Sequence, residues 1–142
     1  MPKRSAHARW IGTLQQGKGT LSLESGAFEG SYSFATRFED APGTNPEELI
    51  GAAHAGCFSM ALSMLLEKAG YPPKDIQTRA DVTIEKVDDG FKITRIDLTT
   101  RAEVPGMDVD SFRQQANAAK EGCPVSQALA GTQISLSAEL KV

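Results

Sequence analysis

The chain has 142 residues, 40% of them hydrophobic and 23% charged, which is enough for one domain with its own core. A net charge of −3 and a pI near 5.4, without any basic block, argue against nucleic acid as a main partner. Two cysteines are too few for a secreted disulfide scaffold, and Met1–Gly12 lacks the apolar segment of a secretory signal. We therefore expect a cytoplasmic protein in which any disulfide is transient, although two buried and inert cysteines fit the same composition.

The first part of the chain predicts three strands separated by glycine-rich turns. Alternating apolar and polar residues place these strands at Ala6–Thr13, Thr20–Glu24 and Tyr32–Phe38. Arg37 lies on the third of them, on the side opposite to the aromatic residues. A loop over residues 39–44 then leads into the middle of the chain.

A long buried helix is predicted in the middle of the chain. Asn45 is a favourable N-cap, and Glu48 stands three residues later, where a capping box needs an acid. No formally charged residue occurs from Leu49 to Leu66, and Gly70 is a natural C-terminal stop. A helix that is apolar almost all round is typical of a buried element.

This apolar run must also be compared with a membrane span, because it approaches the ~20 residues that a span requires. Its many glycine, alanine and serine residues and one histidine make it only weakly hydrophobic, so we favour a buried helix. The small residues indicate close approach to another element. Because few other elements are available to cover the helix, we expect a second copy of the chain to cover it in an intimate homodimer.

The second half of the chain predicts an α+β arrangement with mostly antiparallel strands. An Asp-Asp-Gly turn at residues 88–90 is a strong hairpin signal between two long alternating runs. We treat residues 1–142 as a single domain. The expected elements are strands at Ile76–Val87 and Phe91–Val104, helices at Asp108–Glu121 and Pro124–Ala130, and a last strand at Thr132–Val142.

The two cysteines are the first candidates for chemistry. Cys123 directly precedes Pro124 and therefore occupies the N-cap of a short helix, where free amides and the helix dipole favour a thiolate. The alternative is a small residue packed at a tight corner. His54 lies one turn before Cys57 and could activate a thiol, but we favour a satisfied core histidine. Since His7 is the only other histidine and no cysteine pair has ligand spacing, no metal site is predicted.

A reactive thiolate needs a positive neighbour, and Arg37 is the candidate. A guanidinium near Cys57 would lower the pKa of the thiol and donate a hydrogen bond to a peroxide oxygen, while Glu47 could orient the guanidinium. The simpler interpretations are a solvated strand charge for Arg37 and, for Glu47, an acid stabilised by the helix N-terminus. On the residues alone, the simpler interpretations are preferred.

Two stretches resemble the signatures of one peroxidase superfamily. Asn45–Leu62, with the sequence NPEELIGAAHAGCFSMAL, and Gly122–Gln127, with GCPVSQ, are similar to the motifs of the OsmC (osmotically inducible) and Ohr (organic hydroperoxide resistance) proteins. The resemblance extends from Trp10 to the last strand, and the pattern Gly51–His54 favours the OsmC branch. It implies an OsmC-like fold in which the sheets of an intertwined homodimer wrap around a pair of central helices.

The resemblance also implies roles for four residues. Cys57 matches the peroxidatic cysteine, Cys123 the second cysteine and Arg37 the arginine, while Glu47 rather than Glu48 matches the glutamate after Asn-Pro. It implies reduction of organic hydroperoxides, and less well of hydrogen peroxide, through a Cys57 sulfenic acid and a Cys57–Cys123 disulfide, in oxidative and osmotic stress defence. An external dithiol, of lipoyl type or on a lipoylated protein, would restore the thiols without metal, flavin or haem. A disulfide reductase and a non-enzymatic stress protein that binds a small apolar ligand remain alternatives.

The spacing between Glu47 and Cys57 sets a geometric condition on such a site. Ten residues of continuous helix rise about 15 Å, so one arginine could hardly reach both on the same chain. Either the helix begins after Pro46, or Arg37 and Glu47 reach the Cys57 of the other subunit; we favour a site at the dimer interface. Aromatic and methionine side chains are expected either to wall the pocket or to pack in the core, namely Phe34, Phe38, Phe58 and Met60.

Overall fold

The computed structural model describes residues 1–141, which group into two compact units, Met1–Leu49 and Ile50–Val142. Helix α2, Pro46–Lys68, begins in the first unit and continues into the second, so no linker marks the division. The expectation of a single domain over residues 1–142 stays a prediction. The predicted last strand is described up to Lys141, and its final residue lies outside the described residues.

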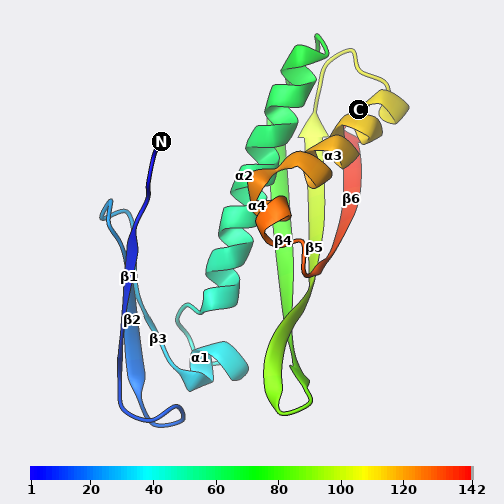
Figure 1. The fold of residues 1–142 in the computed structure, drawn as a ribbon. Helices are drawn as coiled ribbons and strands as arrows, with labels where there is room; N and C mark the ends of the chain where they lie inside the picture. Colours follow the sequence, from blue (N-terminus) through cyan, green and yellow to red (C-terminus); the bar gives the residue numbers. More distant parts are fainter. Residues whose placement is uncertain (142) are drawn as a thin grey trace. The chain divides into compact units, whose positions relative to one another are not determined.

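The first unit is a three-stranded antiparallel sheet of order β1-β2-β3, followed by a short helix (Figure 1). Gly19 in the central strand pairs with Trp10 on one side and Tyr32 on the other. The rings of these two residues lie 5.3 Å apart, and a Cβ at Gly19 would come within 2.7 Å of Trp10 and 2.5 Å of Tyr32. Only glycine therefore fits at this position. The elements are β1 (Ala6–Ile11), β2 (Lys18–Leu23), β3 (Glu29–Tyr32) and α1 (Phe34–Phe38).

The predicted third strand is wrong beyond Tyr32, because residues 34–38 form helix α1. The Ser33 hydroxyl accepts a hydrogen bond from the Thr36 amide at 3.2 Å, and the Ser33 amide donates to Thr36 Oγ1 at 2.8 Å. This reciprocal capping box satisfies the first turn of a helix. Local capping therefore outweighs the aromatic spacing, and Arg37 lies in the last turn of α1 rather than on a strand.

The predicted ends of α2 are confirmed. The side-chain oxygen of Asn45 accepts a hydrogen bond from the Glu48 amide at 2.8 Å, as an N-cap should. At the other end Gly70 has φ +91°, and the Tyr71 amide reaches back to the Leu66 carbonyl at 2.9 Å. This is a Schellman ending, which needs a residue without a Cβ at the left-handed position.

The second unit contains α2 from Ile50 onward and a three-stranded sheet of order β4-β5-β6 (Figure 1). The hairpin β4–β5 is antiparallel, whereas β6 runs parallel to β5 after a crossover through two helices. The α+β class with mostly antiparallel strands is therefore confirmed. The elements are β4 (Asp75–Val87), β5 (Gly90–Glu103), α3 (Val109–Gly122), α4 (Pro124–Ala128) and β6 (Gln133–Lys141).

One face of this sheet builds the hydrophobic core of the second unit. Alternate residues of β5 meet side chains of α2 and α3, and each fully buried large side chain contributes about 1.5–3 kcal/mol. At Gly51, α2 comes so close to β4 that a Cβ would touch the Ala80 carbonyl oxygen at 3.4 Å. The small residues of α2 therefore do permit close approach. The largest core side chains are Phe58, Leu62, Leu66, Ile96, Leu98 and Phe112.

A second face of α2 is exposed, so the expectation of a helix buried all round is not met within one chain. Met60 is 76% exposed and Met64 48%, and a Cβ at Gly56 would meet nothing within 4 Å. By length and composition α2 could span a membrane, with mean hydropathy 1.7 and only 28% of that window buried. An uncharged apolar helix face of this kind indicates a partner surface.

Candidate active site

The two cysteines meet in the second unit. Cys57 is half-buried on α2, Cys123 is fully buried, and their sulfurs lie 2.8 Å apart as free thiols in hydrogen-bonding geometry. Cys123 ends α3 and begins α4, because its ψ of 128° before Pro124 interrupts the helical path. The structure therefore places the two thiols within a small side-chain movement of a disulfide, whose sulfurs are ~2.05 Å apart.

The electrostatics of this pair act on Cys57. Burial raises the pKa of the Cys57 thiol, and the contact with Cys123 raises it further, because two adjacent thiols cannot both ionise easily. The backbone amide of Val125 opposes this shift by donating a hydrogen bond to the Cys57 sulfur, which lowers the pKa. The first turn of α4 thus donates a hydrogen bond to Cys57. That the start of α4 favours a thiolate at Cys123 stays a prediction. Since the net direction is upward, a thiolate at Cys57 needs a further positive group.

A second polar contact joins α2 to α4. His54 is fully buried, and its Nε2 lies 2.7 Å from the hydroxyl oxygen of Ser126. Burial lowers the pKa of His54, so its imidazole is neutral at neutral pH. Its Nδ1 has no hydrogen-bond partner among residues 1–141. The prediction of a satisfied core histidine is therefore confirmed for one ring nitrogen only.

Arg37 and Glu47 form an ion pair in the first unit. Arg37 Nε donates to Glu47 Oε1 and a terminal nitrogen donates to Oε2, both at 3.0 Å. The Glu47 side chain is 8% exposed and that of Arg37 36%, and the guanidinium lies 5.3 Å from the centre of the Phe38 ring. Glu48 instead accepts a hydrogen bond from the Thr44 hydroxyl at 3.1 Å. The fork on Glu47 orients Arg37 and leaves guanidinium N–H groups available for a ligand.

An aromatic pocket of about 230 Å³ lies beside Arg37 in the first unit. Phe34 and Phe38, two of the four residues expected at a pocket wall, line it, and their ring centres lie 5.0 Å apart. Of the other two, Phe58 is fully buried in the core and Met60 is exposed on α2. The pocket is lined by Trp10, Leu14, Tyr32, Ser33, Phe34, Arg37 and Phe38.

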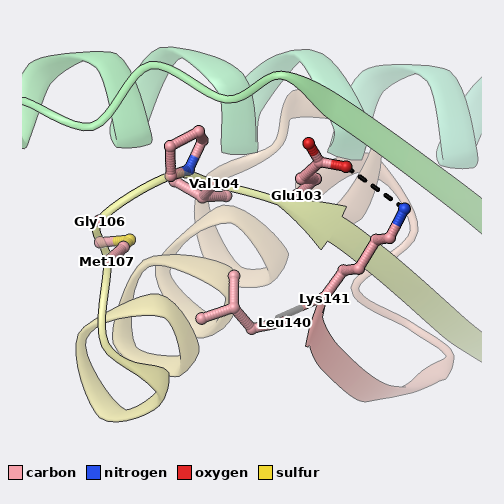
Figure 2. A pocket seen from close by; sticks show the side chains of 7 residues that line it. Glu103, Val104, Gly106, Met107, Leu140 and Lys141 are labelled. Carbon is pink, nitrogen blue, oxygen red and sulfur yellow. Dashed lines mark ion pairs between the residues drawn. The ribbon is translucent and has the colours of Figure 1, made fainter.

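A larger pocket of about 450 Å³ lies between the ends of β5 and β6 and the loop that leads to α3 (Figure 2). The two charged residues that line it, Glu103 and Lys141, form an ion pair at 3.3 Å. Lys74, outside the lining, pairs with the same carboxylate at 3.5 Å. Its lining includes none of the four predicted site residues. In the described part of the chain, no group of three or more histidine, cysteine or acidic side chains is placed to hold a metal ion.

Residues 38–138 match the family of OsmC-like proteins. The chain belongs to this family. Over 139 residues it is 52% identical to Peroxiredoxin OsmC of Escherichia coli (strain K12), covering 97% of this chain and 96% of the relative. It is 32% identical over 104 residues to the organic hydroperoxide resistance protein OhrB of Bacillus subtilis (strain 168), covering 72% and 74%.

Solved structures of OsmC-like proteins have the same fold. An OsmC-like protein of unknown function from Vibrio cholerae superposes with a TM-score of 0.77 at 17% identity, covering 97% of this chain and 99% of that one. The crystal structure of OhrB of Bacillus subtilis superposes with a TM-score of 0.69 at 27% identity, covering 96% and 98%. The resemblance inferred from the two motifs is therefore confirmed, together with the OsmC-like fold.

The structure thus groups the predicted residues into two pairs, Cys57 with Cys123 and Arg37 with Glu47, in different compact units. Sequence reasoning missed Ser126 as the partner of His54. The signal was present in the spacing, because Ser126 follows Cys123 by three residues just as Cys57 follows His54.

Proposed function

We propose that this protein reduces organic hydroperoxides to alcohols with two cysteines. Membership of the family and the relative named Peroxiredoxin OsmC make the chain a cysteine-based peroxidase. The observation that carries the finer proposal is the 2.8 Å contact between the sulfurs of Cys57 and Cys123. A half-buried thiol beside a fully buried one suits a nucleophile that peroxide can reach and a resolving thiol that it reaches less easily.

The proposed reaction has three steps. The Cys57 thiolate attacks the peroxide oxygen distal to the organic group; the O–O bond breaks, the alkoxide takes a proton and leaves as alcohol, and Cys57 becomes a sulfenic acid. The Cys123 sulfur then attacks the Cys57 sulfur, the S–O bond breaks and water leaves as the disulfide forms. An external dithiol, for which we propose a lipoyl-type group on a small molecule or protein, restores both thiols by two exchanges.

Arg37 and its pocket are proposed to bind the peroxide. The fork on Glu47 holds the guanidinium in place, and its remaining N–H groups can bind the peroxide oxygens and stabilise the Cys57 thiolate. The aromatic walls at Phe34 and Phe38 would hold an alkyl or aryl group, which favours organic peroxides over hydrogen peroxide. No metal, flavin or haem takes part in this scheme.

We propose that a second copy of the chain covers the exposed face of α2. The helix begins at Pro46, so the alternative of a later start is excluded, and Glu47 and Cys57 lie ten residues apart on one helix. That spacing corresponds to about 15 Å of rise, which favours action of Arg37 and Glu47 on the Cys57 of the partner. A partner helix suits the small residues of this face, and we place the resulting homodimer in the cytoplasm, free of membrane and nucleic acid.

Replacing Gly56 tests this dimer. A leucine would clash with a partner helix, so we expect Gly56→Leu to shift the protein from dimer to monomer in light scattering after gel filtration. If no partner covered this face of α2, replacing glycine with leucine would instead stabilise the helix by about 1 kcal/mol. Ala118→Leu, on an exposed position of α3, is the control that should remain dimeric. A dimeric and more stable Gly56→Leu protein would contradict the proposal.

The peroxidase proposal is tested by intact mass. One equivalent of cumene hydroperoxide should remove both thiols of the reduced protein with a loss of about 2 Da, and dihydrolipoamide should reverse the change. Disulfide exchange without any response to peroxide would favour the disulfide reductase. Survival of both thiols in an excess of several organic peroxides would leave the ligand-binding protein as the better explanation.

A further inference from the structure

Two side-chain contacts fasten α4 to α2, and the proposed reaction uses only one of them. The first joins the sulfurs of Cys57 and Cys123 at 2.8 Å, and the second joins His54 Nε2 to the Ser126 hydroxyl at 2.7 Å. Within α2 and within α4 the two residues are three positions apart, which puts them on adjacent turns of one helix face. The contacts are therefore neighbours on a single helix–helix seam.

The side chains of Cys123 and Ser126, at the start of α4, bond to α2 instead of capping their own helix. Cys123 is the N-cap of α4 but makes no side-chain capping bond. Ser126, at the third helical position, directs its hydroxyl to His54 instead of to its own helix end. Polar side chains at the start of a helix usually satisfy its free amides. Here they reach across to α2, which fixes the start of α4 against the helix that carries Cys57.

The His54–Ser126 hydrogen bond is not altered by the proposed reaction, because neither residue is oxidised in it. Both residues are buried, with exposures of 0% and 5%. Because an unpaired buried acceptor is tolerated better than an unpaired N–H, we assign the proton to Nε2, which donates to the Ser126 hydroxyl and leaves Nδ1 as the bare acceptor. Breaking this bond would leave two buried polar groups without a hydrogen-bond partner, which destabilises the fold.

The thiol contact, in contrast, is interrupted during the reaction. When peroxide oxidises Cys57, the sulfenic oxygen occupies a position on the Cys57 sulfur, and the thiol–thiol hydrogen bond is lost. The Cys123 sulfur must nevertheless stay within reach until the new bond forms. The His54–Ser126 bond still joins a side chain of α2 to a side chain of α4 at that stage, whereas the Val125 amide contacts the sulfur that has itself been oxidised.

We propose that His54 and Ser126 are positioning residues that hold Cys123 against Cys57 while the disulfide forms. This inference rests on the proposed two-cysteine peroxidase. The step they assist converts the sulfenic acid of Cys57 and the thiol of Cys123 into a disulfide and one water. It needs no further oxidant, and neither His54 nor Ser126 changes its oxidation state. By keeping Cys123 close, the pair also limits the time during which a second peroxide can oxidise the sulfenic acid to sulfinic acid.

The test compares two rates in the full-length protein. Stopped-flow consumption of cumene hydroperoxide reports oxidation of Cys57, and quenched intact mass reports the later loss of water as the disulfide forms. For Ser126→Ala we expect the ratio of the second rate to the first to fall about tenfold, within the range that slight misplacement of reacting groups produces. With excess peroxide, the fraction of protein that gains about 32 Da as sulfinic acid should rise accordingly.

His54 variants separate positioning from general stability. Gln places an amide N–H near the position of Nε2, so His54→Gln should recover most of the wild-type ratio, whereas His54→Leu should not. Ser59→Ala is the matched control, because it removes another 2.7 Å hydroxyl contact of α2, to Thr78 on β4, without touching α4. Thermal melting of every variant checks folding.

Three results would overturn the inference: a wild-type ratio in Ser126→Ala, a His54→Gln protein as slow as His54→Leu, or an equal loss in Ser59→Ala. The second remains informative even if Ser126→Ala folds poorly. Failure of the underlying function has a different signature, since the wild-type protein itself would then keep both thiols after peroxide treatment.

Discussion

Cys57→Ser is expected to reduce peroxide consumption to the rate of buffer alone. The hydroxyl of serine does not ionise near neutral pH and is a poor nucleophile toward peroxide oxygen, so the first bond cannot form. The nearby Cys123 should not substitute for it, because Cys123 is fully buried whereas Cys57 is half-exposed. Consumption of cumene hydroperoxide by the reduced variant measures this directly.

Cys123→Ser is the companion variant and should behave differently. It should consume one equivalent of peroxide and then stop, with a gain of about 16 Da as the sulfenic acid of Cys57, which dimedone traps. Excess peroxide should carry it on to the sulfinic acid. If Cys57→Ser consumed peroxide and Cys123→Ser did not, the two roles would have to be exchanged.

The ends of helices could be predicted from sequence because their signals are local. Helix α2 begins after Asn45 and ends before Gly70, as expected. The Asp88–Gly90 turn joins the two long strands, with Asp88 at φ +54°. Helix α1 was missed although its signal is equally local. The capping residues Ser33 and Thr36 stand in the sequence, but the aromatic spacing was interpreted as a strand.

Local sequence patterns could not predict the contact between the two cysteines, because Cys57 and Cys123 are 66 positions apart. Their meeting depends on the crossover from β5 through α3 and α4, which returns α4 to α2. The direction in which the pKa of Cys57 is shifted could not be predicted either, because it depends on contacts between residues distant in sequence. Burial and the neighbouring thiol raise it, and both are consequences of tertiary packing. The contact between Arg37 and Glu47 could be predicted from sequence, since the two residues are only ten positions apart.

Arg37→Gln is expected to lower the rate of peroxide reduction by about 10²- to 10³-fold, the usual loss when a donor to a developing oxyanion is removed. Glutamine keeps polarity but removes the charge and the bidentate fork on Glu47. Because burial and Cys123 raise the pKa of Cys57, a positive group must offset them if the thiol is to ionise near neutral pH. The same substitution should therefore raise the pKa of Cys57.

Alkylation measures whether Arg37→Gln raises or lowers the pKa of Cys57. The thiolate fraction increases with pH through the pKa, so the rate of iodoacetamide modification of Cys57 follows it. In a Cys123→Ser background, adding Arg37→Gln should move this profile to higher pH and leave less thiolate at pH 7. Arg79→Gln, which removes an exposed arginine paired with Asp81 on β4, is the control that should leave the profile in place. An unchanged profile in Arg37→Gln would separate Arg37 from Cys57.

Mixed dimers decide whether Arg37 acts within its own chain or on the partner. A subunit with Arg37→Gln retains Cys57, and a subunit with Cys57→Ser retains Arg37, so each homodimer should be inactive. If Arg37 reaches the partner's thiol, the mixed dimer contains one complete site and recovers about half of the wild-type activity per dimer. If Arg37 acts on its own Cys57, no complete site exists in any combination, and mixing restores nothing. Since α2 is continuous from Pro46 to Lys68 and separates Glu47 from Cys57 along one helix, we expect recovery.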